Sequence, residues 1–142
     1  MTGFNSGVRR VWVLALLAVL ANACSTSSNA PKTGSTIVLD GHRIVDHGTI
    51  DVGGQTIEDV HVRNYFFEPT VFTGSGGQSI TLSIDNGTTT LHNFSLPLQR
   101  IDQDVPPGQS VQVSVTLPAD GELVFFCKYH RRLGMLGEVR AG

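Results

Sequence analysis

Two segments of this sequence, residues 78–85 and 109–117, alternate apolar and polar residues without interruption. The apolar positions are Ile80, Leu82 and Ile84 in the first segment and Val111, Val113, Val115 and Leu117 in the second. Successive side chains of a β-strand point to opposite faces, so this pattern buries one face and leaves the other in solvent. The two segments therefore predict strands of a sheet that packs on a core.

Shorter apolar segments flank these strands, and none after residue 24 has the period and length of a helix. They lie at residues 57–72, interrupted by Pro69, and at 91–96, 123–127 and 134–140. The run 123–127 is apolar throughout, which is typical of a strand buried on both faces. Asn86-Gly87 predicts a turn. We predict an all-β fold, a Greek-key sandwich or barrel of about seven to eight strands.

The N-terminal segment has the features of an export signal. Arg9 and Arg10 precede an apolar run over residues 11–21, which is shorter than the length that a membrane-spanning helix requires. The following Ala21-Asn22-Ala23-Cys24 is similar to the bacterial lipoprotein signal, which implies lipid attachment at Cys24; plain cleavage at Ala21-Asn22-Ala23 is the alternative. We predict a signal peptide at 1–23, a flexible tether at 24–36, an arm or extra strands at 37–57, and the main domain at 58–142.

The charge balance excludes one class of partner. The whole chain has a net charge of −2, and removal of residues 1–23 takes away two arginines and no acid, which leaves 8 basic and 12 acidic residues. A mildly acidic domain has no electrostatic footprint for nucleic acid. We therefore expect no nucleic-acid partner.

Three residues that can bind a metal fall within nine positions, at Cys127, His130 and Met135. His92 is a fourth candidate, on the strand predicted after the Asn86-Gly87 turn. Two imidazoles, a thiolate and a thioether suit a copper ion that changes between Cu(I) and Cu(II). Zinc is the alternative metal, but it has no use for the methionine and its structural sites usually contain paired Cys-x-x-Cys spacing.

His92-Asn93 followed by Cys-x-x-His-x-x-x-x-Met resembles the blue copper cupredoxins, with the loop spacing of plastocyanin and pseudoazurin. The likeness extends over residues 59–142 and includes Tyr65-Phe66-Phe67 and Pro106-Pro107-Gly108. It implies one copper ion held by His92, Cys127 and His130 in a plane, with Met135 as a distant axial ligand. It also implies that Asn93 ties its strand to the cysteine loop by hydrogen bonds.

Basic residues beside the ligands suggest a docking role. Lys128, Arg131 and Arg132 make this loop more basic than the loop of plastocyanin, and they could steer an acidic redox partner to the edge of His130. The other histidines, His42, His47 and His61, are expected to face solvent, with a second metal site there as the less favoured alternative.

Two functions compete for this set of residues. The first is a single-electron carrier of the cell envelope, monomeric and anchored to a bacterial membrane, whose redox partner proteins the sequence does not identify. The second is a lipoprotein that sequesters or delivers copper; the open Met-rich or His-rich tracts typical of that role are missing, because Met135 is the only methionine after residue 23. We expect no enzymatic activity, since four protein ligands leave no open position for a substrate.

Overall fold

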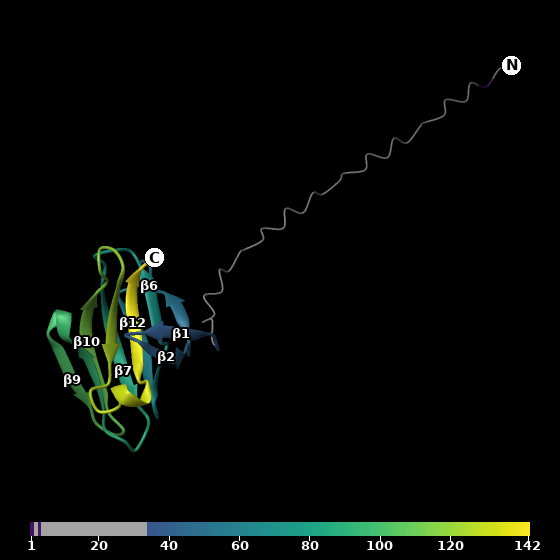
Figure 1. Cartoon of the computed structure of the whole chain (residues 1–142). Coiled ribbons are helices and arrows are strands. Elements are labelled where there is room, and N and C mark those ends of the chain that lie inside the picture. The colour runs from purple at the N-terminus through teal and green to yellow at the C-terminus, as the bar shows by residue number, and fades with distance from the viewer. Residues whose placement is uncertain (2, 4–33) are drawn as a thin grey trace.

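The computed structural model describes residues 1, 3 and 34–142, so the predicted signal peptide, Cys24 and most of the predicted tether lie outside the described residues. The described part contains twelve strands and two short 3-10 helices (Figure 1). The strands are β1 (Thr36–Leu39), β2 (His42–Val45), β3 (Thr49–Asp51), β4 (Ile57–Arg63), β5 (Phe66–Glu68), β6 (Val71–Gly74), β7 (Ser79–Asn86), β8 (His92–Leu96), β9 (Ile101–Val105), β10 (Ser110–Thr116), β11 (Glu122–Phe126) and β12 (Leu136–Ala141), and the helices are η1 (Pro97–Gln99) and η2 (Arg131–Leu133). None of the helices found there is long and apolar enough to cross a membrane.

Two main sheets form the domain, which confirms the predicted all-β fold class. One sheet has four strands in the order β10-β7-β4-β5, and the other has six in the order β3-β6-β12-β11-β8-β9. The strand number is higher than expected, with nine strands from residue 57 onward. Pro69 separates β5 from β6, and β9, which has little apolar alternation, forms by pairing with β8 along its whole length.

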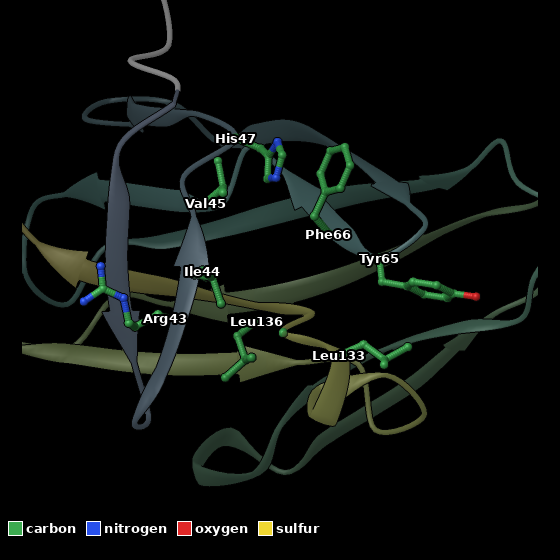
Figure 2. A pocket seen from close by; sticks show the side chains of 9 residues that line it. Arg43, Ile44, Val45, His47, Tyr65, Phe66, Leu133 and Leu136 are labelled. Atoms are coloured by element: carbon green, nitrogen blue, oxygen red, sulfur yellow. The ribbon is translucent and has the colours of Figure 1, made fainter.

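The segment 37–57, expected as an arm or extra strands, contains β2, β3 and all of β1 except its first residue, Thr36. β1 and β2 make a separate hairpin, and β3 pairs in parallel with β6 at the edge of the six-stranded sheet. The hairpin turns at Asp40-Gly41, whose φ angles of 49° and 76° are those of a type I′ turn. Ile44 of the hairpin packs with Leu136 of β12 (Figure 2). The hairpin therefore covers part of the outer face of the six-stranded sheet.

That cover explains the apolar run at 123–127. Phe125 and Cys127 are fully buried in the main core, while Val124 and Phe126 on the opposite face pack against the cluster of Leu39, Ile44 and Leu136. Both faces of β11 are therefore in apolar contact, although Leu123, Val124 and Phe126 keep some exposure.

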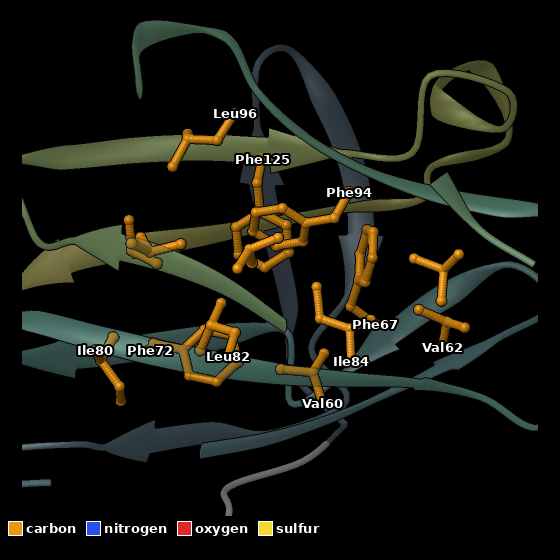
Figure 3. Close-up of a cluster of buried hydrophobic side chains, with 14 of the residues drawn as sticks. Val60, Val62, Phe67, Phe72, Ile80, Leu82, Ile84, Phe94, Leu96 and Phe125 are labelled. Atoms are coloured by element: carbon orange, nitrogen blue, oxygen red, sulfur yellow. The ribbon is translucent and has the colours of Figure 1, made fainter. Parts of the chain in front are cut away.

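The main core lies between the two sheets (Figure 3). The alternating segments pair with each other as β7 and β10, in a register that sets Ile80 opposite Val115, Leu82 opposite Val113 and Ile84 opposite Val111. Four phenylalanines fill the centre of the sandwich: Phe67, Phe72, Phe94 and Phe125. Phe94 and Phe125 stack with ring centroids 4.7 Å apart. Because Phe125 is two residues before Cys127, this packing fixes the end of β11.

The Asn86-Gly87 turn does not make a hairpin. β7 belongs to the four-stranded sheet and β8 to the six-stranded sheet, so the chain crosses between sheets at this point. Asn86 is buried, and its Nδ2 donates hydrogen bonds to the carbonyl oxygens of Thr90 and Val105 at 2.9 and 2.8 Å. The crossing is thereby tied to β9, and it brings the chain to His92 at the first position of β8.

Candidate metal centre

His92, Cys127 and His130 come together at one end of the sandwich. One ligand atom from each, two ring nitrogens and Sγ, all lie within 4.8 Å of one another. His92 begins β8, Cys127 follows β11 directly, and His130 precedes η2. The antiparallel pairing of β11 with β8, at Phe126 and Ser95, brings the two ends together. The geometry is that of a site that could hold one metal ion.

His92 is fully buried and is presented by one nitrogen. Its Nε2 lies 2.8 Å from Oδ1 of Asn64, an acceptor, so Nε2 carries the ring proton and donates a hydrogen bond to that oxygen. Its Nδ1 is buried and has no hydrogen-bond partner among the described residues. Burial, together with the neighbouring His130, lowers the pKa of His92 from 6.5 to about 4. The ring therefore stays neutral at physiological pH, with a free lone pair that fits a metal ion.

His130 faces both other members of the cluster. Its Nδ1 lies 3.3 Å from Sγ of Cys127, and its ring centroid lies 4.9 Å from that of His92. Burial lowers its pKa, which favours the neutral, ligating form. In contrast to His92, His130 keeps partial exposure, and so it forms the outer edge of the cluster.

The thiol of Cys127 is buried, and burial raises its pKa, although backbone groups of Tyr129, His130 and Asn93 act in the opposite direction. Without a metal the group is therefore a protonated thiol at neutral pH. A soft cation that binds here must displace that proton, so uptake of the metal depends on pH.

The loop from Cys127 to Met135 closes on itself. The amide of Cys127 donates to the carbonyl of Met135 at 3.0 Å, and the amide of Met135 donates to the carbonyl of His130 at 3.3 Å. Met135 is fully buried in the same core cluster as Cys127. The fourth sequence candidate therefore lies at the base of the loop, on the interior side.

Asn93 joins β8 to this loop. Its Oδ1 accepts a hydrogen bond from the amide of Lys128 at 3.3 Å, and its Nδ2 donates to Asp102 and Asp104 of β9 at 2.8 and 3.0 Å. This is the contact that the cupredoxin resemblance implied. One buried amide side chain thus connects the strand of His92, the loop of Cys127 and the edge strand.

Two of the three basic residues that we expect to form a docking surface are paired with acidic side chains. Lys128 pairs with Asp102 and Asp104 at 2.8 and 2.9 Å, and Arg131 pairs with Asp40 of the hairpin turn. These acidic residues are distant from the loop in sequence, and the packing of β9 and of the β1–β2 hairpin places them beside it. Among the three basic residues, only Arg132 has no acidic partner in the described part of the chain. The local field near His130 is therefore weaker than the sequence suggested.

The remaining histidines form no second metal cluster within the described residues. His61 is exposed as expected and lies 3.8 Å from Asp85. His42 and His47 are instead half-buried, and the ring of His47 stacks on Phe66 with centroids 3.6 Å apart. The stack on Phe66 brings His47 into contact with the main domain, which the glycine-rich flanking sequence did not indicate.

Two residues contact the candidate ligands although neither of them was assigned a role there from the sequence. Asn64 holds Nε2 of His92, and the ring of Tyr65 lies 4.5 Å from that of His130. Both residues lie in the short turn between β4 and β5. Asn64 is 28 positions before His92 in the sequence. No local pattern pointed to Asn64, although Tyr65 was part of the aromatic segment that resembles cupredoxins.

Comparison with known proteins places this arrangement in a family. Residues 13–139 match the family described as Cupredoxin-like domain. A search of curated proteins finds no match.

Solved structures with a similar fold include two auracyanins. Dithionite-reduced auracyanin from Roseiflexus castenholzii has a TM-score of 0.50 and 20% identity and covers 62% of this chain and 98% of its own. The blue copper protein auracyanin A from Chloroflexus aurantiacus has a TM-score of 0.50 and 17% identity over 67% of this chain and all of its own.

A third similar structure is the metal-binding domain of the Cu(I)-exporting P-type ATPase of Streptococcus pneumoniae. It has a TM-score of 0.55 and 10% identity over 65% of this chain and 95% of its own. At these identities the three structures show a shared fold. The family match, which extends over most of its length, establishes that the chain belongs to the cupredoxin-like domain family.

Proposed function

We propose that this protein is a single-electron carrier outside the cytoplasm and that it would hold one copper ion through His92, Cys127 and His130, with Met135 as a weaker fourth ligand. The donor set fits copper: the Nδ1 of the neutral His92 ring has no hydrogen-bond partner in the part of the chain that the structure describes, and a thiol lies beside two imidazoles. Bound copper would supply a one-electron couple between Cu(II) and Cu(I), which this mixture of nitrogen and sulfur tolerates in both states.

The observation that carries the proposal is the difference in burial among the four residues. His92, Cys127 and Met135 have no solvent exposure, and only His130 reaches the surface. Ligands buried in the core of the sandwich exchange metal slowly and rearrange little, while one exposed imidazole edge provides a path for an electron. A site for copper delivery needs ligands that a second protein can reach.

The surface around His130 suggests how a redox partner would dock. Tyr65, Tyr129 and Leu133 lie next to His130 and are 40%, 46% and 62% exposed. Since Lys128 and Arg131 are paired within the chain, contact with a partner would depend on this apolar rim more than on net charge. The membrane anchor at Cys24 completes the proposal by keeping the carrier near membrane-bound partners.

The experiment that tests the function is the visible spectrum of the purified protein after addition of Cu(II), then ascorbate, then a mild oxidant. An intense band that bleaches and returns supports the electron carrier. Absence of the band, or copper kept as colourless Cu(I) and lost to a chelator, supports sequestration or delivery. His61→Ala is a matched control, because His61 is exposed and lies outside the cluster.

A further inference from the structure

The β1–β2 hairpin contacts the loop that carries His130 and Met135. The Asp40 carboxylate at the tip of the hairpin accepts a hydrogen bond from Nη2 of Arg131. The guanidinium carbon of Arg131 lies 4.3 Å from the ring centroid of Phe126, on the hairpin side of β11. Arg131 is therefore held between the hairpin turn and the sheet, at the position directly after His130.

A second contact is apolar and lies at the other end of η2. Gly134 and Ile44 line the same pocket, and a Cβ added to Gly134 would lie 3.4 Å from Cγ2 of Ile44, so the hairpin leaves room there for little more than a glycine. Gly134 has a φ angle of 84° and ends η2 in the left-handed conformation. Ile44 is 8% exposed and packs with Leu136. The hairpin thus contacts the chain on both sides of Leu133.

A groove of about 260 Å³ runs beside these contacts (Figure 2). Hairpin residues Arg43, Ile44 and Val45 line it together with Tyr65 and Leu133. At its upper end, as drawn in Figure 2, His47 stacks on Phe66, and Tyr65 next to it in sequence packs on the His130 ring. The segment that follows β2 is therefore connected, through Phe66 and the adjoining Tyr65, to the ring of His130.

Backbone hydrogen bonds link the residues that the hairpin contacts to the two candidate ligands, His130 and Met135. The amide of Leu133 donates to the carbonyl of His130 at 2.9 Å, and the amide of Gly134 donates to that of Arg131 at 3.0 Å. The amide of Met135 also bonds the carbonyl of His130. η2 is consequently one small unit with a candidate ligand at each end, and a contact that fixes Arg131 and Gly134 fixes both.

We propose that the β1–β2 hairpin acts as a clamp on the ligand loop, in which Asp40 and Ile44 are positioning residues for His130 and Met135. This inference rests on the proposed function for its purpose, that of keeping the geometry of the site the same in both oxidation states. Surface loops are by default the mobile part of a β-sandwich, and a site is only as rigid as the residues that support it.

The exposure of the ion pair distinguishes positioning from simple stabilisation. The Asp40 and Arg131 side chains are 42% and 44% exposed, and exposed ion pairs contribute little to the stability of a whole domain. The clamp is therefore expected to affect the local motion of the loop more than global unfolding, and high salt should weaken it.

Amide hydrogen exchange of the metal-free protein tests the clamp without relying on copper. In Asp40→Asn, which tolerates the left-handed turn, we expect Leu133, Gly134 and Met135 to exchange about twofold faster, with the thermal midpoint nearly unchanged. In Ile44→Ala the same amides should exchange about tenfold faster or more, because a buried side chain is truncated. Val38→Ala is the matched control, since Val38 is 63% exposed on the same hairpin.

Copper-loaded protein supplies the second measurement, the copper hyperfine splitting and the reduction potential. Both quantities should change in Asp40→Asn and Ile44→Ala and stay constant in Val38→Ala. In 1 M salt, the two values of the wild type should move toward those of Asp40→Asn. If the loop amides keep their protection while those of the hairpin lose it, the hairpin is only a cover and the clamp is wrong. If the loop amides respond but wild type forms no coloured copper site, the clamp stands and the electron-carrier function is wrong.

Discussion

The two sides of the candidate metal centre are built in different ways. On the loop side, Cys127, His130 and Met135 lie within nine residues, and their backbone hydrogen bonds are made within the loop itself. On the strand side, the ring of His92 is held by a side chain from elsewhere, Asn64 in the β4–β5 turn, while the neighbouring Asn93 joins β8 to the loop at Lys128. The loop thus supplies most donors, while the strand side sets the orientation of a single donor.

This difference indicates how the two sides should respond to mutation. A change on the loop side removes a donor and alters the chemistry directly. A change on the strand side leaves all donors present but alters the tautomer or the position of His92. Four predictions separate these cases, beginning with the largest effect.

Cys127→Ser should abolish the intense visible band of the copper-loaded protein, because the alcohol does not replace the thiolate as a soft, charge-donating ligand. Circular dichroism should still show a folded β protein, since the substitution is small and the core phenylalanines are unaffected. A variant that keeps the band would contradict the assignment of Cys127 as a ligand.

The strand side should give the metal-free protein a distinctive pH dependence. The pKa of His92 is lowered to about 4, so between pH 6.5 and 4 the unfolded chain binds the proton and the folded chain does not. The free energy of unfolding should therefore fall as pH drops through this window, by up to about 3 kcal/mol from His92. His130, whose pKa is also lowered, adds to the trend.

The contribution of His92 is the difference in the free energy of unfolding between wild type and His92→Gln, measured by denaturant unfolding at several pH values. This difference is needed because burial raises the pKa of Glu58 and Glu138, which favours the folded state as pH falls. Bound metal should steepen the dependence, since the ligands release protons to bind the metal and take them up again on unfolding. Equal slopes in the two proteins would show that His92 is not held neutral.

Asn64→Ala should lower copper affinity about ten- to a hundredfold, because it removes the acceptor that keeps the proton of His92 on Nε2. Asn64 is exposed, so the free energy of unfolding should change by less than about 0.5 kcal/mol. Competition titration with a chelator measures the affinity, and nitrogen NMR of the metal-free protein reports the tautomer. Asn64→Asp is the matched control, since it retains an acceptor oxygen at the same position.

Substitutions of Met135 should have the smallest effect on the colour and should tune the reduction potential. Met135→Gln is expected to keep a coloured site and to lower the potential, because a harder axial donor favours Cu(II). Met135→Leu conserves volume, should cost less than about 1.5 kcal/mol, and should raise the potential by removing the donor. Voltammetry of both variants checks the prediction, and equal potentials would assign Met135 to the core alone.

Much of the fold could be read from local patterns. The alternating apolar residues predicted β7 and β10, and the apolar run before Cys127 predicted β11, each within one or two residues. β9 was missed, because its residues have little apolar character and it is a strand only through pairing with β8. Asn86-Gly87 was read as a turn, but its effect on topology depended on the buried contacts of Asn86 with Thr90 and Val105.

The sequence alone determined the candidate donors, because metal chemistry depends on residue type, and three of the four are close enough in the chain for their spacing to carry information. Only the tertiary structure decided how those donors are presented. In the folded protein, Asn64 orients the ring of His92 by a hydrogen bond, and acidic residues of β9 and the hairpin form ion pairs with Lys128 and Arg131. The hairpin also lies next to η2. These contacts join residues 26 to 91 positions apart, and no local pattern specifies such pairs, because they form only when separate strands pack on one core.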